Sequence, residues 1–279
     1  MKDSIGLVVK RESSLALEVA RRVVGTLKSL KADFSVEEST DYPELRSYER
    51  FSLRGELPEK LIVIGGDGTL LRTLLNIQRE SPLLLGIRAG KRGFLLEVDR
   101  YEVEERVRDF VEGRYKVVEY PRLAVYVNSE AYPCVMNDAV LLAKMGKMVR
   151  LIASVDGYVA MRIDGDGIIV STTMGSTAHA LSAGGPIVDP RLKVNVVVPL
   201  NPVQLHLRPI VIPGESYVEI SLTANSNEAY LSLDGQVTSE LGPGSTVAIG
   251  PCNFGVKMVR FKRGENFYER LYTRVLTYW

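Results

Sequence analysis

Hydrophobic positions in the first part of the chain alternate between short continuous runs and helical spacing. The run at 5–9 predicts a buried strand, and the apolar residues that follow recur every three or four positions, which predicts a helix from about Leu15 to Leu30. Phe34 and Val36 indicate a second short strand. Residues 37–60 are charged, contain prolines and have no clean period, so we expect a loop-rich crossover.

The same alternation continues to about residue 111. Apolar runs at 61–64 and 83–87 predict two more strands, a helix is expected over 70–78 between them, and 101–111 reads as a charged amphipathic helix. Strands that alternate with helices are typical of a mostly parallel sheet. We therefore expect an α/β, Rossmann-like N-terminal domain over residues 1–115.

After Gly113 the pattern changes to short β-rich runs separated by turns. Asp156-Gly157 between two apolar runs is a strong hairpin signal. Further strands are expected at 123–127, 140–143, 194–198, 217–222, 229–233 and 246–249. This pattern predicts a mainly β C-terminal domain over 116–260, built as a sandwich or as layered sheets. Residues 261–279 return to helical spacing and are expected to pack back on the first domain.

Composition limits the classes of partner. The chain has 35 basic and 34 acidic residues, a net charge of +1, so no global field attracts nucleic acid or an anionic membrane. No apolar run approaches the length of a membrane span, and the N-terminus lacks a signal-peptide pattern, so we expect a cytoplasmic protein. Cys134 and Cys252 lie far apart and belong to no CxxC pair, which argues against a zinc site or a disulfide scaffold, and unpaired thiols in a reducing cytoplasm are expected.

The strand at 61–64 ends in the sequence Gly65-Gly66-Asp67-Gly68-Thr69. A turn from a parallel strand into a helix lies where open α/β sheets bind ligands, and its backbone N–H groups suit phosphate. Thr69 is the expected N-cap of the helix. Asp67 has two possible functions, as a general base for an attacking hydroxyl or as a ligand of a divalent cation. In the alternative, Asp67 only bonds its own backbone in a tight turn.

A second glycine-rich segment, residues 163–190, is crowded with serine and threonine. Small side chains let a ligand lie close to the main chain, and hydroxyl groups donate or accept hydrogen bonds. A helix is expected to start under Ser176 or Thr177 and to present a positive N-terminus. A ligand-free connection remains the alternative reading of this segment.

Together these segments resemble the NAD kinase family, whose members phosphorylate the 2′-hydroxyl of the adenosine ribose of NAD to give NADP. The matching blocks are GGDGT at 65–69, GIRAGKRGFL at 86–95, NDAVL at 137–141, the long block at 164–190, RPIVIP at 208–213 and DGQ at 234–236. GGDGT alone is shared with lipid kinases and phosphofructokinases, whereas the serine, threonine and glycine block is far more specific.

The resemblance implies a role for each matching residue. Asp67 matches the catalytic base, and the donor phosphates would lie against Gly65, Gly66, Gly68, Thr69 and Arg88. The residues that match the NAD-binding set are Phe94, Asn137, Asp138, Asp166, Thr177, Ala178, His179, Ser182 and Gln236. Arg88, Lys91 and Arg92 depart from the usual family residues, and the sequence leaves open whether they touch the donor.

The resemblance also implies domain roles, cofactors and partners. The first domain would carry the phosphoryl donor and the catalytic loop, and the β-rich domain would bind NAD. The expected ligands are NAD, ATP or polyphosphate as donor, and a divalent cation, with Mg²⁺ expected and its ligands unknown. A homodimer or homotetramer is implied, with neighbouring subunits completing the site.

Two other functions stay open at this stage. A lipid or sugar kinase would share GGDGT but gives no reason for the second glycine-rich block. A dinucleotide sensor without catalysis would not need Asp67 and its glycines.

Overall fold

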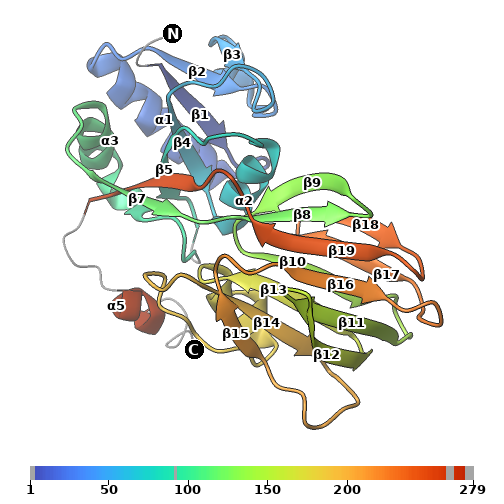
Figure 1. Ribbon diagram of the computed structural model, residues 1–279. Helices are drawn as coiled ribbons and strands as arrows, with labels where there is room; N and C mark the ends of the chain where they lie inside the picture. Colours follow the sequence, from blue (N-terminus) through green and yellow to red (C-terminus); the bar gives the residue numbers. More distant parts are fainter. Residues whose placement is uncertain (1–3, 91–92, 262–266, 274–279) are drawn as a thin grey trace. The chain divides into compact units, whose positions relative to one another are not determined.

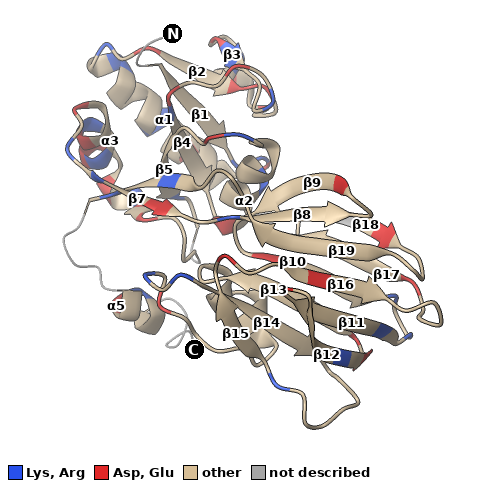
Figure 2. Ribbon diagram, in the orientation of Figure 1, with Lys and Arg blue, Asp and Glu red and all other residues tan. Residues whose placement is uncertain are grey.

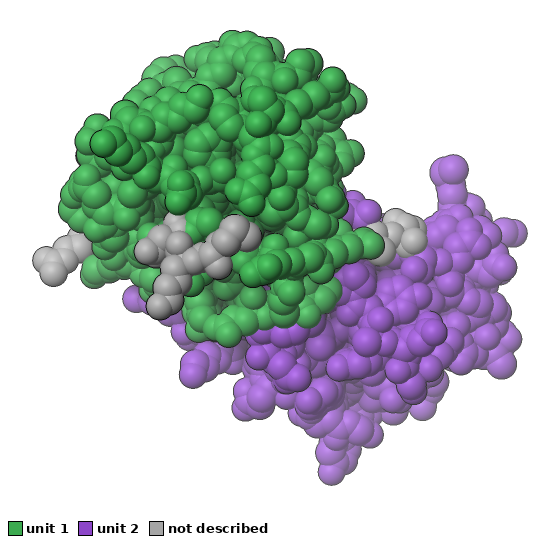
Figure 3. All heavy atoms as spheres, turned by 90° about the horizontal axis from the view of Figure 1, so that it is seen from above, with its two compact units in different colours: residues 1–120, 255–279 green, residues 121–254 purple. Residues whose placement is uncertain are grey.

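The chain forms two compact units in a computed structural model that describes residues 4–90, 93–261 and 267–273 (Figure 1). One unit comprises Met1–Tyr120 and Gly255–Trp279, and the other comprises Pro121–Phe254 (Figure 3). The predicted domain boundaries at 115 and 260 differ from these limits. The chain returns to the first unit after residue 254, because a late strand pairs with the first sheet.

The first unit is built on an eight-stranded sheet. Its elements are β1 (Ile5–Val9), α1 (Ser14–Ser29), β2 (Phe34–Glu37), η1 (Pro43–Leu45), β3 (Arg50–Phe51), β4 (Lys60–Gly65), α2 (Asp67–Asn76), β5 (Leu83–Arg88), β6 (Val98–Asp99), η2 (Arg100–Glu102), α3 (Val103–Val111), β7 (Lys116–Tyr120), β20 (Val256–Arg260) and α5 (Phe267–Leu271).

The strands of this sheet follow the order β3-β2-β1-β4-β5-β20-β7, with β6 beside β5. All pairs are parallel except β20 with β7, which confirms the predicted mostly parallel sheet. Ile62 and Ile64 of β4 belong to the core that α1 and α3 cover. Leu61 and Val63 are equally buried and point to the other face, where α2 packs against β4. Helices on both faces explain why these strands read as continuous apolar runs.

The second unit consists of two six-stranded antiparallel sheets, as expected for layered sheets. One has the order β15-β14-β13-β10-β17-β18, and the other has the order β12-β11-β16-β19-β8-β9. Its elements are β8 (Leu123–Val127), β9 (Glu130–Val135), β10 (Asp138–Ala143), β11 (Val149–Val155), β12 (Tyr158–Gly165), β13 (Gly167–Thr172), η3 (Gly175–Thr177), α4 (His179–Ser182), β14 (Val194–Leu200), β15 (Ile210–Pro213), β16 (Val218–Leu222), β17 (Ala229–Leu233), β18 (Val237–Leu241) and β19 (Thr246–Pro251).

The hairpin predicted at Asp156-Gly157 is confirmed. Asp156 has φ 49° and Gly157 has φ 84°, and the two residues join the antiparallel strands β11 and β12. Positive φ at both central residues matches the twist of the strands that the turn connects. Aspartate and glycine adopt this conformation at low cost, which is why the dipeptide was informative.

Charged positions of both signs are interspersed along both units (Figure 2). Helix α3, for example, carries arginine beside glutamate and aspartate. None of the helices in the described part of the chain has the length and apolar character needed for a membrane crossing.

The two cysteines form a disulfide, so the expectation that they stay unpaired is wrong. Leu123, at the start of β8, pairs with Val135 of β9 and with Pro251 of β19. The neighbours Cys134 and Cys252 therefore flank the same strand end, with a Cα–Cα distance of 6.4 Å. The sequence separation of 118 residues hid this pairing, because only the order of strands in the sheet brings the two positions together.

Loss of this disulfide should lower the stability of the protein. A cross-link that closes a loop of this length removes denatured-state entropy equivalent to about 5 kcal/mol in the chain-entropy model. The double variant Cys134→Ser with Cys252→Ser should therefore unfold at lower temperature and lower urea concentration than the oxidised wild type. Reductant should shift the wild-type transition toward that of the variant, and equal transitions for all three samples would contradict the assignment.

Candidate active site

Helix α2 begins at Asp67, three residues earlier than expected. Gly66 is the N-cap, with φ −130° and ψ −176°, and Asp67 is the first residue of the helix. Thr69 is therefore not the N-cap but the third helical residue, and its Oγ1 accepts from the N–H of Gly66 at 3.5 Å. The N–H groups of Thr69 and Leu70 donate to the Gly66 carbonyl, so the glycine turn presents the N–H groups of Asp67 and Gly68 at the carboxyl end of β4.

The carboxylate of Asp67 is held by a different segment of the chain. Its Oδ2 accepts from the N–H of Phe94 at 2.7 Å, and its Oδ1 accepts from the N–H of Leu95 at 3.0 Å. Residues 94 and 95 end the block 86–95, so the structure joins two of the sequence motifs. A tight turn in which Asp67 bonds only its own backbone is not what the structure contains. Two N–H donors from outside the turn fix the orientation of the carboxylate.

Close packing explains two of the glycines around this carboxylate. A Cβ on Gly65 would lie 2.4 Å from Thr69 Oγ1 and 3.0 Å from Lys10 Cβ. A Cβ on Gly93 would lie 3.2 Å from Asp67 Oδ1. A side chain at either position would push the glycine turn or Asp67 out of place. Gly93 was not singled out from the sequence, because its contact with Asp67 spans distant positions.

Arg88, predicted to bind donor phosphate, is engaged in an ion pair. It ends β5, and its guanidinium lies 2.5 Å from Asp99 Oδ2. Burial raises the pKa of Asp99, but the hydrogen bonds from Arg88 and from the Tyr101 N–H outweigh burial and leave the pKa lowered. Arg88 therefore stabilises the connection between β5 and β6. Lys91 and Arg92 lie outside the described residues.

The ring of Phe94, a residue of the predicted NAD-binding set, is buried against α5. Phe267 meets it edge-on with the ring centroids 6.0 Å apart, and the Arg270 guanidinium lies 5.6 Å from its centroid. Phe94 has an exposed fraction of 9%. Its main-chain N–H, rather than its ring, is the group that reaches Asp67.

In the second unit, Asp234 organises the segment that contains Asn137 and Asp138. Its carboxylate accepts from the N–H groups of Met136, Asn137 and Asp138 at 2.9, 2.7 and 3.1 Å. Asp234 sits in the turn after β17 with φ 49° and is buried. From the motif DGQ the sequence analysis assigned a role to Gln236, which is exposed in the same turn. It assigned none to Asp234, the first residue of that motif, which organises the segment.

Asp138 and Asp234 form a buried acidic pair. Burial is the main cause that raises the pKa of Asp138, to about 7, and the charge of Asp234 adds to it. Burial also raises the pKa of Asp234, although three N–H donors and the charge of Arg122 oppose the rise. Arg122 is itself buried, and burial lowers its pKa to about 10. Since the hydrogen bonds favour ionised Asp234, the proton of the pair resides on Asp138.

The segment after β13 packs against residues 136 and 137, which directly precede β10. Thr172 Oγ1 donates to the carbonyl of Met136 at 2.6 Å, and a Cβ on Gly175 would lie 2.2 Å from the Asn137 carbonyl oxygen. Two buried side-chain oxygens here, Asn137 Oδ1 and Thr173 Oγ1, have no hydrogen-bond partner among the described residues. Unpaired buried polar atoms are costly, so they mark positions where a ligand would complete the bonding.

The helix expected under Ser176 or Thr177 is much shorter than predicted. A single 3₁₀ turn, η3, is followed by the four-residue α4, so this segment presents no helix N-terminus for binding. Ser176 Oγ instead donates to the Thr173 carbonyl at 2.7 Å and accepts from the N–H of Val188 at 3.1 Å. Thr177 and Ala178 are half-buried, whereas His179 and Ser182 are exposed.

Asp166 lies at the opposite end of β13. Asp138 pairs with Ser171, near the carboxyl end of that strand, whereas Asp166 immediately precedes the first residue, Gly167. Five residues of strand separate the two positions by about 16 Å. Asp166 is exposed, and its Oδ2 accepts from Asn201 Nδ2 at 2.8 Å. The structure therefore does not bring Asp166 together with Asn137 and Asp138 within one chain.

A glycine-flanked aspartate that begins a helix at the carboxyl end of a parallel strand is an arrangement that suits phosphate, as a phosphotransferase of the kinase type requires. Family models identify the chain more closely. The model of the ATP-NAD kinase N-terminal domain matches residues 5–115, and that of the C-terminal domain matches residues 136–261. The chain belongs to the NAD kinase family.

Individual relatives agree with this assignment. An NAD kinase of Aeropyrum pernix is 52% identical over the whole of both chains, and one of Thermococcus gammatolerans is 38% identical over 92% of this chain and 93% of its own. The crystal structure of an NAD kinase from Archaeoglobus fulgidus in complex with ATP is 27% identical, covers 98% of both chains and has a TM-score of 0.78. A yeast NADH kinase complexed with NADH, at 22% identity and TM-score 0.86 over 99% of this chain and 88% of its own, shares the fold.

Replacement of Asp138 by asparagine should flatten the pH dependence of stability. The pKa of Asp138 is raised from 3.8 to about 7 in the folded state, so its favourable contribution is complete below pH 3.8 and is lost as pH rises through 7. An asparagine at this position cannot ionise, and the variant should gain about 3 kcal/mol relative to wild type between pH 5 and 8. Urea unfolding at several pH values measures this difference. The exposed Asp33→Asn serves as control, and parallel profiles for wild type and Asp138→Asn would contradict the assignment.

Proposed function

We propose that this protein transfers a phosphoryl group from ATP, another nucleoside triphosphate or polyphosphate to the 2′-hydroxyl of the adenosine ribose of NAD, giving NADP. One observation carries the mechanism: the Asp67 carboxylate is fixed on a glycine turn by the N–H groups of Phe94 and Leu95. Family membership supports the substrate, since the models of the N-terminal and C-terminal domains match residues 5–115 and 136–261.

Asp67 acts as the general base in this proposal. A carboxylate has about four lone-pair sites, and the two N–H groups take two of them, so acceptors remain for the hydroxyl proton. A ribose hydroxyl is a weak nucleophile, and removal of its proton during attack is the step that a carboxylate in hydrogen-bond reach accelerates. The donor phosphates lie against Gly65, Gly66, Gly68 and Thr69 in this arrangement, with the N–H groups of Asp67 and Gly68 as the donors of the turn.

Residues around the buried acidic pair bind the dinucleotide. Asn137 Oδ1 and Thr173 Oγ1 are buried without partners among the described residues, and burial raises the pKa of Asp138 to about 7, so its carboxyl is partly protonated at neutral pH. A neutral carboxyl donates one hydrogen bond and accepts others, which suits the mixed donors and acceptors of an adenosine group. Thr177, Ala178, His179, Ser182 and Gln236 form the rest of the proposed NAD-binding set.

A divalent cation, with Mg²⁺ expected, completes the proposal. Among the described residues no group of three or more His, Cys, Asp and Glu side chains could hold a metal. Mg²⁺ usually keeps water ligands and takes one or two carboxylates together with substrate phosphates. Because Asp67 is assigned as the base, the proposal places the cation on the donor phosphates and water and assigns it no protein ligand. When bound, the cation would neutralise charge on the donor phosphates.

The alternative functions receive less support. A lipid or sugar kinase shares only the glycine turn, whereas the family model for the C-terminal domain extends over residues 136–261. A sensor without catalysis has no need for a carboxylate oriented by two distant N–H groups. A cytoplasmic location follows from the proposed substrates, since NAD and ATP are intracellular metabolites. The disulfide is compatible with that location, because intracellular disulfides occur in some hyperthermophilic organisms.

The protein acts as a homodimer or homotetramer in this proposal, with Asp166 serving the site of a neighbouring subunit. The position of Asp166 at the far end of β13 from Asp138 supports this arrangement. A ligand held by Asn137 and Asp138 would meet an Asp166 only if another chain supplied it, unless the ligand ran along the whole strand.

The Asp67→Asn substitution should lower turnover far more than NAD binding. Asparagine keeps the size of the side chain but loses the base, and its NH₂ group faces one of the two N–H donors. Loss of a general base typically costs about 10²- to 10⁴-fold in rate. NADP formation from NAD, Mg²⁺ and each donor gives turnover, and titration of the full chain with NAD gives affinity. With Asp33→Asn as control, equal losses of turnover and affinity would remove the base assignment.

Mixed oligomers test the assignment of Asp166. Asp67→Asn and Asp166→Ala subunits, carrying different tags and co-expressed, are purified through both tags. If Asp166 serves the neighbouring site, one site of each mixed dimer has both residues intact, and activity should recover to about half that of wild type. Activity no higher than that of the two parent variants would place Asp166 in the site of its own chain.

A further inference from the structure

The segment that holds Asp67 is itself fixed by the last part of the chain. Phe94 and Leu95 supply the two N–H groups that bind the Asp67 carboxylate, and we call residues 94–97 the base-holding segment. Glu97, its last residue, contacts the end of strand β20, which joins the first sheet only after the chain has completed the second unit. The contact spans 164 positions of sequence.

The Glu97 carboxylate makes two contacts at the end of β20. Its Oε1 accepts from the N–H of Phe261 at 2.8 Å, and its Oε2 lies 3.3 Å from Nε of Arg260. The second contact is an ion pair without a hydrogen bond, because that Nε donates to Tyr120 Oη at 3.2 Å. Only 8% of the Glu97 side chain and 10% of the Arg260 side chain are exposed. Both contacts are stronger where little water reaches them, so they define the position of Glu97.

Two other contacts fix the same segment. Phe267 and Arg270 of α5 pack against the ring of Phe94. Leu96 lies tightly on β5, since a Cβ on Gly86 would be 2.4 Å from Leu96 Cδ2 and 3.3 Å from its Cα. The base-holding segment thus has three anchors, on α5, β5 and β20. Two of them, α5 and β20, come from the end of the chain.

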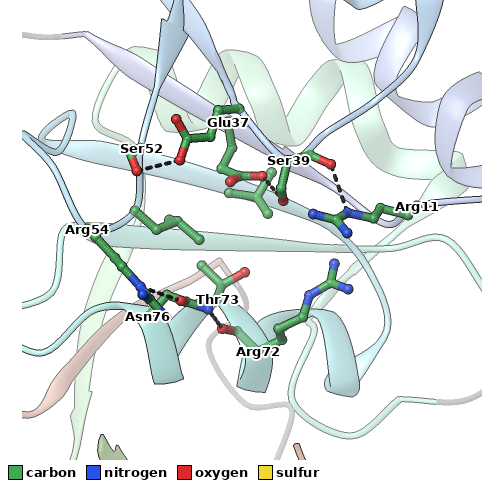
Figure 4. A pocket seen from close by; sticks show the side chains of 11 residues that line it. Arg11, Glu37, Ser39, Ser52, Arg54, Arg72, Thr73 and Asn76 are labelled. Atoms are coloured by element: carbon green, nitrogen blue, oxygen red, sulfur yellow. Dashed lines mark hydrogen bonds between the residues drawn. The ribbon is translucent and has the colours of Figure 1, made fainter.

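The pocket beside helix α2 does not include Glu97. This pocket has a volume of about 320 Å³, and all of its lining residues lie between positions 8 and 76, among them Arg72 and Asn76 of α2 (Figure 4). Neither Glu97 nor Arg260 lines it. Because the Glu97 carboxylate is buried and bound to protein groups, it acts on Asp67 through the protein and not through a ligand.

We propose that Glu97 is a positioning residue for the catalytic base, held in place by the end of β20. Its contacts fix the end of the base-holding segment, so that Phe94 and Leu95 present their N–H groups where they orient the Asp67 carboxylate. The inference rests on the proposed function and names a residue that the reaction needs in addition to Asp67. A misplacement of about 1 Å can cost on the order of 10²-fold in rate, so a small movement of the segment is measurable.

Glu97→Ala should lower kcat and leave substrate affinity unchanged. We expect the kcat for NADP formation to fall about 10- to 100-fold, while the KM for NAD and the KM for ATP stay within about twofold. In the Asp67→Asn background the same substitution should change kcat by less than about twofold, because the oriented base is already lost. A loss of the same size in both backgrounds would mean that Glu97 acts independently of Asp67 and would overturn the proposal.

Hydrogen exchange tests the same contact without turnover. Exchange is followed by mass spectrometry on the full chain, in peptides that contain residues 94 and 95. Glu97→Ala should raise exchange there about tenfold and leave β1 unchanged, because the amides that donate to Asp67 lose their support. Asp109→Ala is the matched control. It removes a carboxylate that is 14% exposed and pairs with Arg106 and Arg114, and it should change neither kcat nor exchange at 94 and 95.

A double variant separates positioning from folding. Removal of Glu97 alone leaves the buried charge of Arg260 without its ion-pair partner, which can destabilise the fold. Glu97→Leu combined with Arg260→Met replaces both charges by apolar side chains of similar size, so thermal unfolding should stay close to that of wild type. This variant still lacks the acceptor for the N–H of Phe261, and its kcat should fall as in Glu97→Ala. Wild-type kcat in the double variant would overturn the proposal.

These outcomes are distinguishable from failure of the proposed function. If wild type makes no NADP and Glu97→Ala raises exchange at residues 94 and 95, the positioning contact stands and the proposed reaction fails. If NADP is made and Glu97→Ala keeps both the kcat and the exchange of wild type, the reaction stands and the assignment of Glu97 fails.

Discussion

The position of one carboxylate depends on two backbone N–H groups that come from another strand connection. Asp67 begins α2, and the N–H groups of Phe94 and Leu95 hold its two oxygens. A Cβ on Gly65 would clash with Thr69, and a Cβ on Gly93 would press on the carboxylate of Asp67. These glycines are therefore needed for close packing as well as for the backbone conformations that glycine allows. Strands β4 and β5 are adjacent in one parallel sheet, so the glycine turn after β4 lies near the segment after β5. The N–H groups of that segment can therefore hold the Asp67 carboxylate.

In the second unit, too, a carboxylate is held by backbone N–H groups. Asp234, in a tight turn, accepts three consecutive N–H groups from residues 136–138 and thereby shapes the start of β10. The consequence is a second acidic side chain, Asp138, buried next to it. A proton on Asp138 relieves the repulsion, in keeping with the raised pKa of that side chain. In both units a carboxylate held by backbone donors fixes a loop that carries candidate ligand-binding groups.

The sequence predicted most strands, the mostly parallel first sheet and the Asp156-Gly157 hairpin, because burial patterns and turn residues act locally. It failed where a decision depended on distant partners. Thr69 looked like a helix cap, but Gly66 has that place. The helix expected after Gly175 is divided into η3 and α4, because Ser176 and Gly175 pack on residues 188 and 137. Strand β20 joined the first sheet beside β5, although it follows the whole β-rich unit.

By itself the sequence determined the family, the class of each unit and the aspartate proposed as the base, since those depend on motifs read in order and on local periodicity. The tertiary structure alone decided which groups touch: Asp67 with Phe94 and Leu95, Asp234 with residues 136–138, Cys134 with Cys252, and Arg88 with Asp99. Each of these contacts joins positions brought together by strand order or chain packing. Strand order is set by the burial of whole faces, a property that no short stretch of sequence contains.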